Sequence, residues 1–368
     1  MSVVFQSPPR ILAGAGSLAE AGTECASLGK KALVVAGKRS ARASGALERL
    51  ETSLREAGVA CVLQAEIASD PTLDVAAAGA AAAREAGAGV IVALGGGSVL
   101  DAAKGIAALA AWDRIDGCPR GAALPLVSIP TTAGSGSEVS RVAVFTLPEK
   151  QLKLALSGDG LISSVAILDP DLTLTLPPLL TASTGLDALA HAMEAYLSRK
   201  AFPQTDLLAL SAIRRIGSSL LAAVRNGRDP EARAAMLLGQ AEAGLACSNA
   251  GAGLVHAMGR PLGAGCGVPH ALAIALLLPA VMDFNRPACE ERMAEMALGA
   301  SGGGSRDCVA LLRSLLKDSG LPETLSACGV KEAALPRMAE VAAANQSALL
   351  NVRAASAGQI LKLYQSCL

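Results

Sequence analysis

The sequence predicts an α/β domain built on a doubly wound, parallel sheet, followed by an all-helical domain. Three observations support this prediction. Short β-branched runs alternate with Ala-rich segments as far as Asp169, a glycine-rich turn follows one of these runs, and the β-branched runs stop after Pro177-Pro178. Alternating strands and helices are typical of parallel sheets with helices on both faces, and the later sequence is dominated by helix formers. We therefore expect an α/β domain over residues 1–178 and an all-α domain over residues 179–368.

Five short apolar runs in the first part of the chain are predicted strands. Their near-continuous apolar character indicates strands buried on both faces of a parallel sheet. The runs are Lys31–Ala36, Ala60–Ile67, Gly89–Leu94, Pro125–Ile129 and Val165–Leu168. Ahead of them, Val3–Phe5 and Arg10–Leu12 are expected to pair with Val142–Leu147 or Leu152–Leu156 in a small accessory sheet.

The composition argues against several classes of partner. The 368 residues include 32 basic and 32 acidic side chains, so the chain lacks the basic excess that attracts nucleic acids or anionic membranes. Aromatic residues make up only 2%, too few for platforms that stack bases. The sequence shows no leader-like start and no apolar run of the roughly 18 residues needed to cross a bilayer. Nine scattered cysteines, none spaced as Cys-x-x-Cys, fit reduced thiols, and we expect a cytoplasmic protein.

A glycine-rich turn follows the predicted strand Gly89–Leu94. The sequence Leu94–Lys104 (LGGGSVLDAAK) runs from a strand through three glycines into a helical segment. Glycines allow the backbone to approach a phosphate, and the start of the helix offers free amides and a positive dipole. Ser98 and Asp101 have the spacing of a capping pair at this helix start. The turn therefore predicts a diphosphate site in a Rossmann-like domain, although a tight turn without a ligand fits the same residues.

A second glycine-rich loop, Ile129–Glu138 (IPTTAGSGSE), carries several hydroxyl groups. These groups suit a phosphate or a nicotinamide amide, and an ordinary polar loop is the alternative. We assign a predicted cofactor-binding set to the two loops, to Lys153 and to the end of the first long strand. Its members are Gly37, Lys38, Arg39, Ser40, Gly95, Gly96, Gly97, Ser98, Asp101, Thr131, Thr132, Ser135 and Lys153.

The sequence has only three histidines, His191, His256 and His270, so any imidazole chemistry must use them. Asp187 and His191 are four residues apart, which places both on one face of a predicted helix. A carboxylate and an imidazole at this spacing suit a divalent metal, although a surface Asp/His pair is the simpler interpretation of this pair alone.

The other two histidines favour the metal interpretation. His256 and His270 would be about 21 Å apart on one straight helix. The glycines and prolines between them, among them Pro261 and Gly263, break the helix and allow the chain to return. All three histidines can therefore converge with Asp187, and such a donor set suits Fe²⁺ or Zn²⁺ rather than Mg²⁺ or Ca²⁺.

Together these motifs resemble the iron-containing (group III) alcohol dehydrogenases over nearly the whole chain. The residues that carry the resemblance are Gly95–Ser98 with Asp101 and Lys104, Pro130–Glu138, Val165–Pro170, Gly185–Tyr196 and Gly253–His270. The resemblance implies an N-terminal dinucleotide-binding domain, a C-terminal helical metal-binding and substrate domain, a metal site in the cleft between them, and a homodimer. It also implies that Asp187, His191, His256 and His270 ligate the metal, which would bind the substrate oxygen while hydride passes to or from the nicotinamide.

The end of the first long strand departs from the family pattern. Many relatives carry an acidic residue there for the ribose hydroxyls, whereas this strand continues as Gly37-Lys38-Arg39-Ser40. Because a carboxylate would repel the 2′-phosphate of NADPH and cations would attract it, we expect NADP(H) to be preferred, with NAD(H) possible. The alternative is that Lys38 and Arg39 are solvated surface charges.

A second departure is Arg260, four residues after His256, where the family commonly has another histidine. Arginine stays charged and cannot readily relay a proton, so the proton must come from water, a cofactor hydroxyl or a Ser/Thr chain. Arg260 is instead a candidate catalytic-site clamp for an acidic group on the substrate, or else a structural ion-pair partner of Glu138 or Glu194. These two glutamates are candidates for orienting ligands, or are merely solvated.

The sequence thus predicts a metal-dependent alcohol dehydrogenase or aldehyde reductase acting on a small alcohol or aldehyde that in some cases carries an acidic group. Two alternatives are a maleylacetate reductase-like enzyme and a dehydroquinate synthase-like cyclase or lyase. The complete set of one aspartate and three histidines speaks against both. A non-enzymatic binding protein with a structural metal is a third alternative, and the glycine-rich loop beside a ligand set argues against it.

Overall fold

The computed structural model describes residues 3–38, 40–150 and 152–368, which form two compact units. The α/β unit comprises Ser7–Lys150 and Leu154–Thr175. The helical unit comprises Leu176–Leu368 and the described residues of 1–6 and 151–153. The α/β followed by helical organisation confirms the predicted fold class, while the predicted division after residue 178 stays a prediction.

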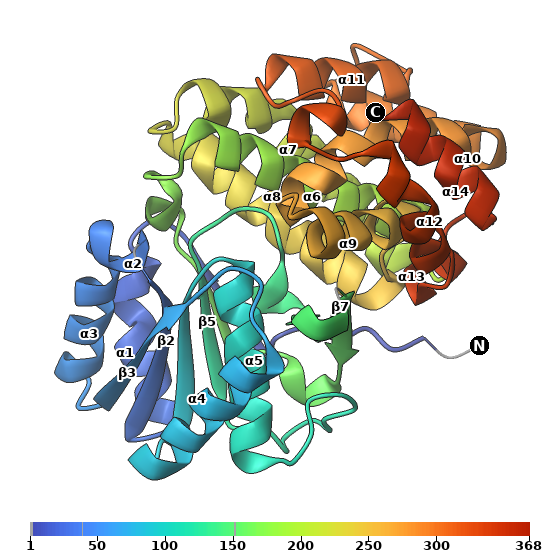
Figure 1. The fold of residues 1–368 in the computed structure, drawn as a ribbon. Helices are drawn as coiled ribbons and strands as arrows, with labels where there is room; N and C mark the ends of the chain where they lie inside the picture. Colours follow the sequence, from blue (N-terminus) through green and yellow to red (C-terminus); the bar gives the residue numbers. More distant parts are fainter. Residues whose placement is uncertain (1–2, 39, 151) are drawn as a thin grey trace. The chain divides into compact units, whose positions relative to one another are not determined.

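A six-stranded sheet forms the centre of the α/β unit (Figure 1). Its strands are β1 (Arg10–Ala13), β2 (Lys31–Gly37), β3 (Ala60–Ile67), β4 (Val90–Gly95), β5 (Leu126–Pro130) and β8 (Val165–Leu168). They lie in the order β1-β8-β5-β4-β2-β3, and all neighbouring pairs are parallel. The five predicted strands are therefore present, each within one residue of its predicted bounds.

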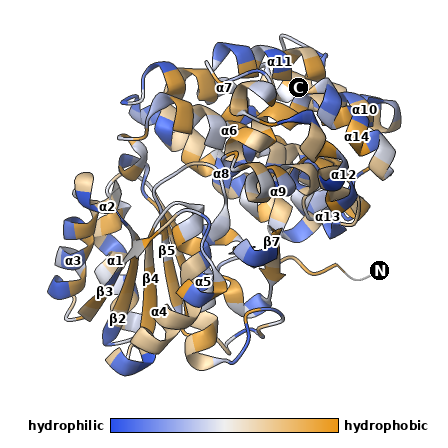
Figure 2. Ribbon diagram, viewed as in Figure 1, coloured by the Kyte–Doolittle hydropathy of each residue, from blue (hydrophilic) through white to orange (hydrophobic). Residues whose placement is uncertain are grey.

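Helices cover both faces of this sheet, as the doubly wound prediction requires. They are α1 (Ala21–Leu28), α2 (Ser40–Ala43), α3 (Ala46–Glu56), α4 (Leu73–Ala86) and α5 (Gly97–Ala111). Alternate residues of the central strands point to opposite faces. Val34 and Val92 pack with α1 and α3, while Val35 and Ile91 pack with α4 and α5. Figure 2 shows the strands of this sheet in the hydrophobic colour, whereas α3 carries many hydrophilic residues.

The strand order places a switch point between β2 and β4. From β2 the chain proceeds outward to β3, then returns to the other side of β2 to form β4 and β5. In open parallel sheets, ligands bind beyond the carboxyl ends of the strands at such a point. Gly37 ends β2 and Gly95 ends β4, so both lie at this edge of the sheet.

Three expectations for this region are wrong. Arg10–Ala13 is an edge strand of the main sheet, paired with β8, because it continues the parallel ladder in register with Val165–Leu168. The two-stranded accessory sheet consists of β6 (Val142–Leu147) and β7 (Leu152–Ser157), and Val3–Phe5 is not a strand. β3 is also an edge strand, so Val62 is 39% exposed rather than buried on both faces.

The helical unit is built from α-helices, as the loss of β-branched runs predicts (Figure 1). They are α6 (Pro178–Leu197), α7 (Pro203–Arg225), α8 (Pro230–Ala250), α9 (Leu254–Cys266), α10 (His270–Ala300), α11 (Cys308–Asp318), α12 (Leu335–Ala343), α13 (Gln346–Leu350) and α14 (Ala357–Ser366). α6 packs against α7, α8 and α10, and α9 packs against α10 and α12. By length and composition alone, α7 and α10 could cross a membrane, but packed core helices meet the same criteria.

Candidate functional site

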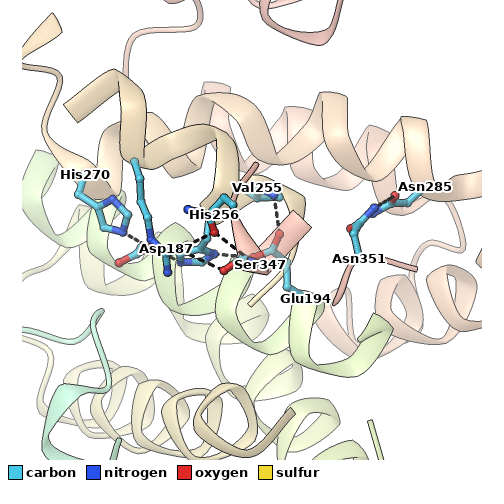
Figure 3. Close-up of polar contacts among 10 residues, drawn as sticks. Asp187, Glu194, Val255, His256, His270, Asn285, Ser347 and Asn351 are labelled. Carbon is cyan, nitrogen blue, oxygen red and sulfur yellow. Dashed lines mark hydrogen bonds and ion pairs between the residues drawn. The ribbon is translucent and has the colours of Figure 1, made fainter. Parts of the chain in front are cut away.

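Three helices of the helical unit bring metal-ligating groups together. Asp187 lies on α6, His256 on α9, and His270 is the first residue of α10. One ligand atom from each residue lies within 4.8 Å of the others. Asp187 Oδ1 is 3.4 Å from His256 Nε2 and 4.0 Å from His270 Nε2 (Figure 3). Asp187 and His256 are buried, and His270 has a side-chain exposure of 34%, so the cluster is partly open on that side.

His191 lies one turn after Asp187 on α6 and stacks on His256, with ring centroids 4.2 Å apart. The rings of His256 and His270 are 5.7 Å apart. Asp187 and all three histidines therefore gather in one place, although His191 is outside the group whose ligand atoms lie within 4.8 Å. The assignment of all four as metal ligands stays a prediction.

The helix break that allows this convergence differs from the expected one. α9 continues through Pro261 and Gly263 and ends at Cys266. Pro261 lies inside this helix and has no amide hydrogen to donate to the Ala257 carbonyl, yet it does not end the helix. The reversal occurs at Gly267, which has a left-handed φ of 70° and is followed by Val268 and Pro269. This short turn places His270 beside Asp187 and His256.

The donor set fits a divalent transition metal. Asp187 Oδ1 and His256 Nε2 are buried, and neither completes a hydrogen bond to a described residue. Burial alone would raise the pKa of Asp187, but the facing His191, His256 and His270 hold it at about 2, so the carboxylate is ionised at neutral pH. One carboxylate with neighbouring imidazoles is a donor set for iron or zinc rather than for magnesium or calcium.

The histidine environments differ. Burial lowers the pKa of His270 to about 3, and the charges of Lys153 and Arg260 act in the same direction. Burial also disfavours charged His256, but the carboxylates of Glu194 and Asp187 outweigh it and raise the pKa to about 9. Glu194 is buried and hydrogen-bonded to His256, which agrees with the expectation that it orients a ligand and excludes the solvated alternative.

Arg260 lies one turn after His256 on α9 and is half-buried. Its Nη1 donates to Asn345 Oδ1 at 3.0 Å and to Ser347 Oγ at 3.1 Å, so the expected ion pair with Glu138 or Glu194 is not what holds it. Within the described chain, Nε and Nη2 have no hydrogen-bond partner and are not closed off from solvent. One edge of the guanidinium is therefore anchored, and the other edge keeps contact with solvent.

Sequence reasoning missed Asn345 and Ser347. Asn345 caps α13 by accepting from the Ser347 amide at 2.9 Å, and the same two side chains bind Arg260. The Asn-x-Ser start of a helical segment is a recognisable cap signal. Its contact with a residue 85 positions earlier depends on tertiary packing and has no local sequence signal.

In the α/β unit, the two glycine-rich loops lie against each other. Gly96 is the N-cap of α5, and a Cβ on Gly97 would come within 2.8 Å of Ser135 Cβ. A Cβ on Gly96 would lie 3.3 Å from the Thr132 side chain. The backbone at this helix start is therefore accessible only because both residues are glycine, which fits the predicted diphosphate cradle.

The predicted capping pair is wrong. Ser98 lies inside α5, and its Oγ accepts from the Asp70 amide at 3.2 Å. Asp101 reaches sideways instead and accepts from Ser137 Oγ at 2.6 Å and from the Val144 amide at 3.0 Å. α5 begins after Gly96 without a side-chain cap hydrogen bond.

Lys104 takes part in the same connection. It is fully buried, and its Nζ donates to Ser140 Oγ at 3.0 Å and to Val142 O at 2.7 Å. Burial lowers the pKa of Lys104 to about 8, against the opposing charges of Asp101 and Glu138. Asp101 and Lys104 therefore attach α5 to the second glycine-rich loop and to β6, and we call these four hydrogen bonds the loop clasp.

The remaining predicted cofactor residues divide into three groups. Thr131 and Thr132 follow β5 directly, beside Gly95 in the neighbouring strand. Lys38 is exposed just beyond β2, whereas Arg39 and the side chain of Ser40 lie outside the described residues. Lys153 belongs to the helical unit, where its Nζ would lie 3.2 Å from a Cβ on Gly263 of α9, so it is not grouped with the two loops.

Comparison with known proteins gives matches over both parts of the chain. Residues 8–170 match the family model described as iron-containing alcohol dehydrogenase, and residues 181–368 match the model for the C-terminal part of the Fe-containing alcohol dehydrogenase family. A probable alcohol dehydrogenase, EutG, of Escherichia coli is 39% identical, over 98% of this chain and 93% of its own.

Two solved structures are similar over almost their full length. A 1,3-propanediol oxidoreductase has a TM-score of 0.94 and 34% identity, with 100% of both chains covered. A sulfoacetaldehyde reductase from Bifidobacterium kashiwanohense, in complex with NAD⁺, has a TM-score of 0.89 and 28% identity, with 100% of this chain and 99% of that chain covered.

Proposed function

The chain belongs to the iron-containing alcohol dehydrogenase family, an oxidoreductase family acting on CH–OH groups, and from this premise we propose the specific reaction and the residues that perform it. The proposed reaction is reversible hydride transfer between a nicotinamide dinucleotide and a small alcohol or aldehyde. The proposed metal ligands are Asp187, His191, His256 and His270.

The observation that carries this proposal is the convergence of Asp187, His256 and His270 from three helices. When bound there, a divalent ion supplies Lewis acidity that polarises the substrate oxygen. The chain itself supplies an ionised carboxylate at Asp187 and an imidazole fixed by Glu194. Fe²⁺ is the proposed resident metal because of the family, and Zn²⁺ fits the same donors.

The α/β unit supplies the proposed cofactor site. The start of α5 presents backbone amides to the diphosphate, and the hydroxyl-bearing loop after β5 lies against it. The direct test is an aldehyde panel with NADPH and NADH after loading the enzyme with Fe²⁺ or Zn²⁺. Net oxidation of the dinucleotide is expected. Loss of turnover on chelation would distinguish the enzyme from a metal-free maleylacetate reductase, and absence of net oxidation would favour a cyclase or lyase.

For the dinucleotide, we expect NADPH to be preferred because Gly37 leaves no carboxylate at the end of β2 and Lys38 is exposed there. The similarity to a reductase whose structure contains NAD⁺ favours NADH instead. In wild type, kcat/KM is expected to be about tenfold or more higher with NADPH, the scale of one charge-assisted hydrogen bond. Gly37→Asp should reverse the order. Higher kcat/KM with NADH in wild type would overturn this expectation.

For the substrate, we propose an aldehyde that carries a carboxylate or sulfonate held by Arg260. The anchored guanidinium with one open edge supports this, as does the similarity to a sulfoacetaldehyde reductase. Arg260→Ala is expected to raise KM for an anionic aldehyde about 10–100-fold and to change KM for a neutral aldehyde of equal length less than about twofold.

The matched control for this substitution is Arg215→Ala, which removes a guanidinium paired with Glu242 in the same unit. It should leave KM unchanged for both aldehydes. An unchanged KM for the anionic aldehyde in Arg260→Ala would assign Arg260 a purely structural role at the α12–α13 turn.

We further propose a cytoplasmic homodimer. All nine cysteines are free, which supports a reducing compartment, and the dimer follows from the resemblance to the family. Light scattering during size-exclusion chromatography measures the oligomeric state.

A further inference from the structure

A buried carboxylate lies directly behind the metal-facing imidazole. Glu194 is 3% exposed, lies on α6 seven residues after Asp187, and points at the start of α9 (Figure 3). Its Oε2 is 2.5 Å from His256 Nδ1, and its Oε1 accepts from the Val255 amide at 2.5 Å. Each carboxylate oxygen is therefore engaged by a different donor of the same helical turn.

These contacts determine which nitrogen of His256 faces the site. With Nδ1 directed at Glu194, Nε2 is directed at Asp187 Oδ1, 3.4 Å away. Imidazoles that bind metals through one nitrogen generally donate from the other nitrogen to a carboxylate or carbonyl, which fixes the ring and its tautomer. The carboxylate thus presents Nε2 toward Asp187 and the proposed metal position.

The second oxygen fixes α9 itself. Gly253 is the N-cap of α9 and provides no side-chain cap. The Val255 amide in the first turn instead donates to Glu194 Oε1 on α6. A Cβ on Gly253 would lie 2.9 Å from Glu194 Oε1 and 3.2 Å from Asn351 Oδ1, so a larger residue there would displace the Glu194 carboxylate. One carboxylate therefore sets both the orientation of His256 and the position of the helix that carries it, relative to Asp187.

We propose that Glu194 is a positioning residue for metal binding, which acts through His256 and through the start of α9. This inference rests on the proposed metal centre and deepens it. It assigns a specific part of the metal affinity to a residue that is not itself a ligand.

The test measures Zn²⁺ affinity of the full-length protein by competition with a chromogenic chelator. Glu194→Gln keeps the volume but has one acceptor oxygen for two donors, and Zn²⁺ binding is expected to weaken about 10–100-fold. Gly253→Ala, which displaces the carboxylate without removing it, should give a smaller loss in the same direction. Glu194→Asp should recover part of the affinity lost in Glu194→Gln, and the visible spectrum of the Co²⁺-loaded variants should change with it.

The matched control is Asn285→Ala. Asn285 is fully buried and exchanges two amide hydrogen bonds with Asn351, at 3.1 and 2.7 Å, without contact to His256. It should lower the melting temperature while leaving Zn²⁺ affinity within twofold of wild type. If Glu194→Gln does not fold, Gly253→Ala decides the result.

Two results would overturn the proposal in distinguishable ways. In the first, wild type binds Zn²⁺ and the folded Glu194→Gln protein binds it equally well; Gly253→Ala replaces Glu194→Gln in this comparison if the latter does not fold. This result would exclude the positioning role and leave the proposed function intact. In the second, wild type binds neither Zn²⁺ nor Fe²⁺, which would exclude both the positioning role and the proposed metal-dependent function. Equal losses of affinity in Asn285→Ala and Glu194→Gln would show a general packing effect and would also overturn it.

Discussion

His256→Ala is expected to abolish metal binding and turnover while the protein keeps its fold. His256 is 2% exposed, faces Asp187 at 3.4 Å and stacks on His191, so its removal opens the middle of the ligand cluster. Lewis-acid stabilisation is worth several kcal/mol, so kcat/KM should fall about a thousandfold or more. The substitution also costs about 3–5 kcal/mol of stability, because the buried carboxylates of Glu194 and Asp187 both lose this partner. Metal content by atomic absorption, circular dichroism and steady-state kinetics measure the three effects.

Chelated wild type provides the reference for this variant. It should lose turnover to the same extent and regain it on addition of Fe²⁺, whereas His256→Ala should not respond. Full activity in a metal-free His256→Ala protein would refute the assignment of the ligands.

Asp101→Ala is expected to destabilise the α/β unit by about 3 kcal/mol and to weaken dinucleotide binding at least tenfold. The substitution removes the acceptor of the Ser137 hydroxyl and the Val144 amide, and it also removes a charge that opposes the desolvation of buried Lys104. Hydrogen bonds to a charged group each contribute about 1.5–3 kcal/mol. Dinucleotide affinity should fall because the loop clasp keeps the two glycine-rich loops in contact.

Chemical denaturation and NADPH fluorescence titration measure these two effects. The control is Asp113→Ala, which removes an exposed carboxylate just after α5 and should change neither quantity. If Asp101→Ala lowered stability without changing the dissociation constant of NADPH, the clasp would stabilise the unit but would not organise the cofactor site.

The α/β unit was largely predictable because its strands are short apolar runs in a parallel sheet. Periodicity and glycine placement identified β2, β4 and β5 to within one residue. The sequence predicts Arg10–Leu12 in the wrong sheet because an edge strand has a weak apolar pattern, with Ile11 39% exposed. Its parallel pairing with β8 joins segments that are far apart in sequence.

The candidate metal centre was predictable for a different reason. With three histidines in the chain, few combinations of imidazoles exist, and the helical spacing of Asp187 and His191 is a local property. What holds these groups is not local. The contact between Glu194 and His256, and the anchoring of Arg260 by Asn345, depend on how helices pack after folding. The sequence pattern therefore indicates Glu194 only as a candidate, and it gives no indication that Asn345 contacts Arg260.

The origin of Asp187, His256 and His270 on α6, α9 and α10 has a thermodynamic consequence. An ion bound by these groups joins segments that are distant in the unfolded chain, so metal bound to the native state should raise its free energy of unfolding. At a free concentration a thousand times the dissociation constant, this increment is about 4 kcal/mol. All three groups belong to the helical unit. In calorimetry, metal loading should therefore raise the melting temperature of the helical unit and have no direct effect on that of the α/β unit.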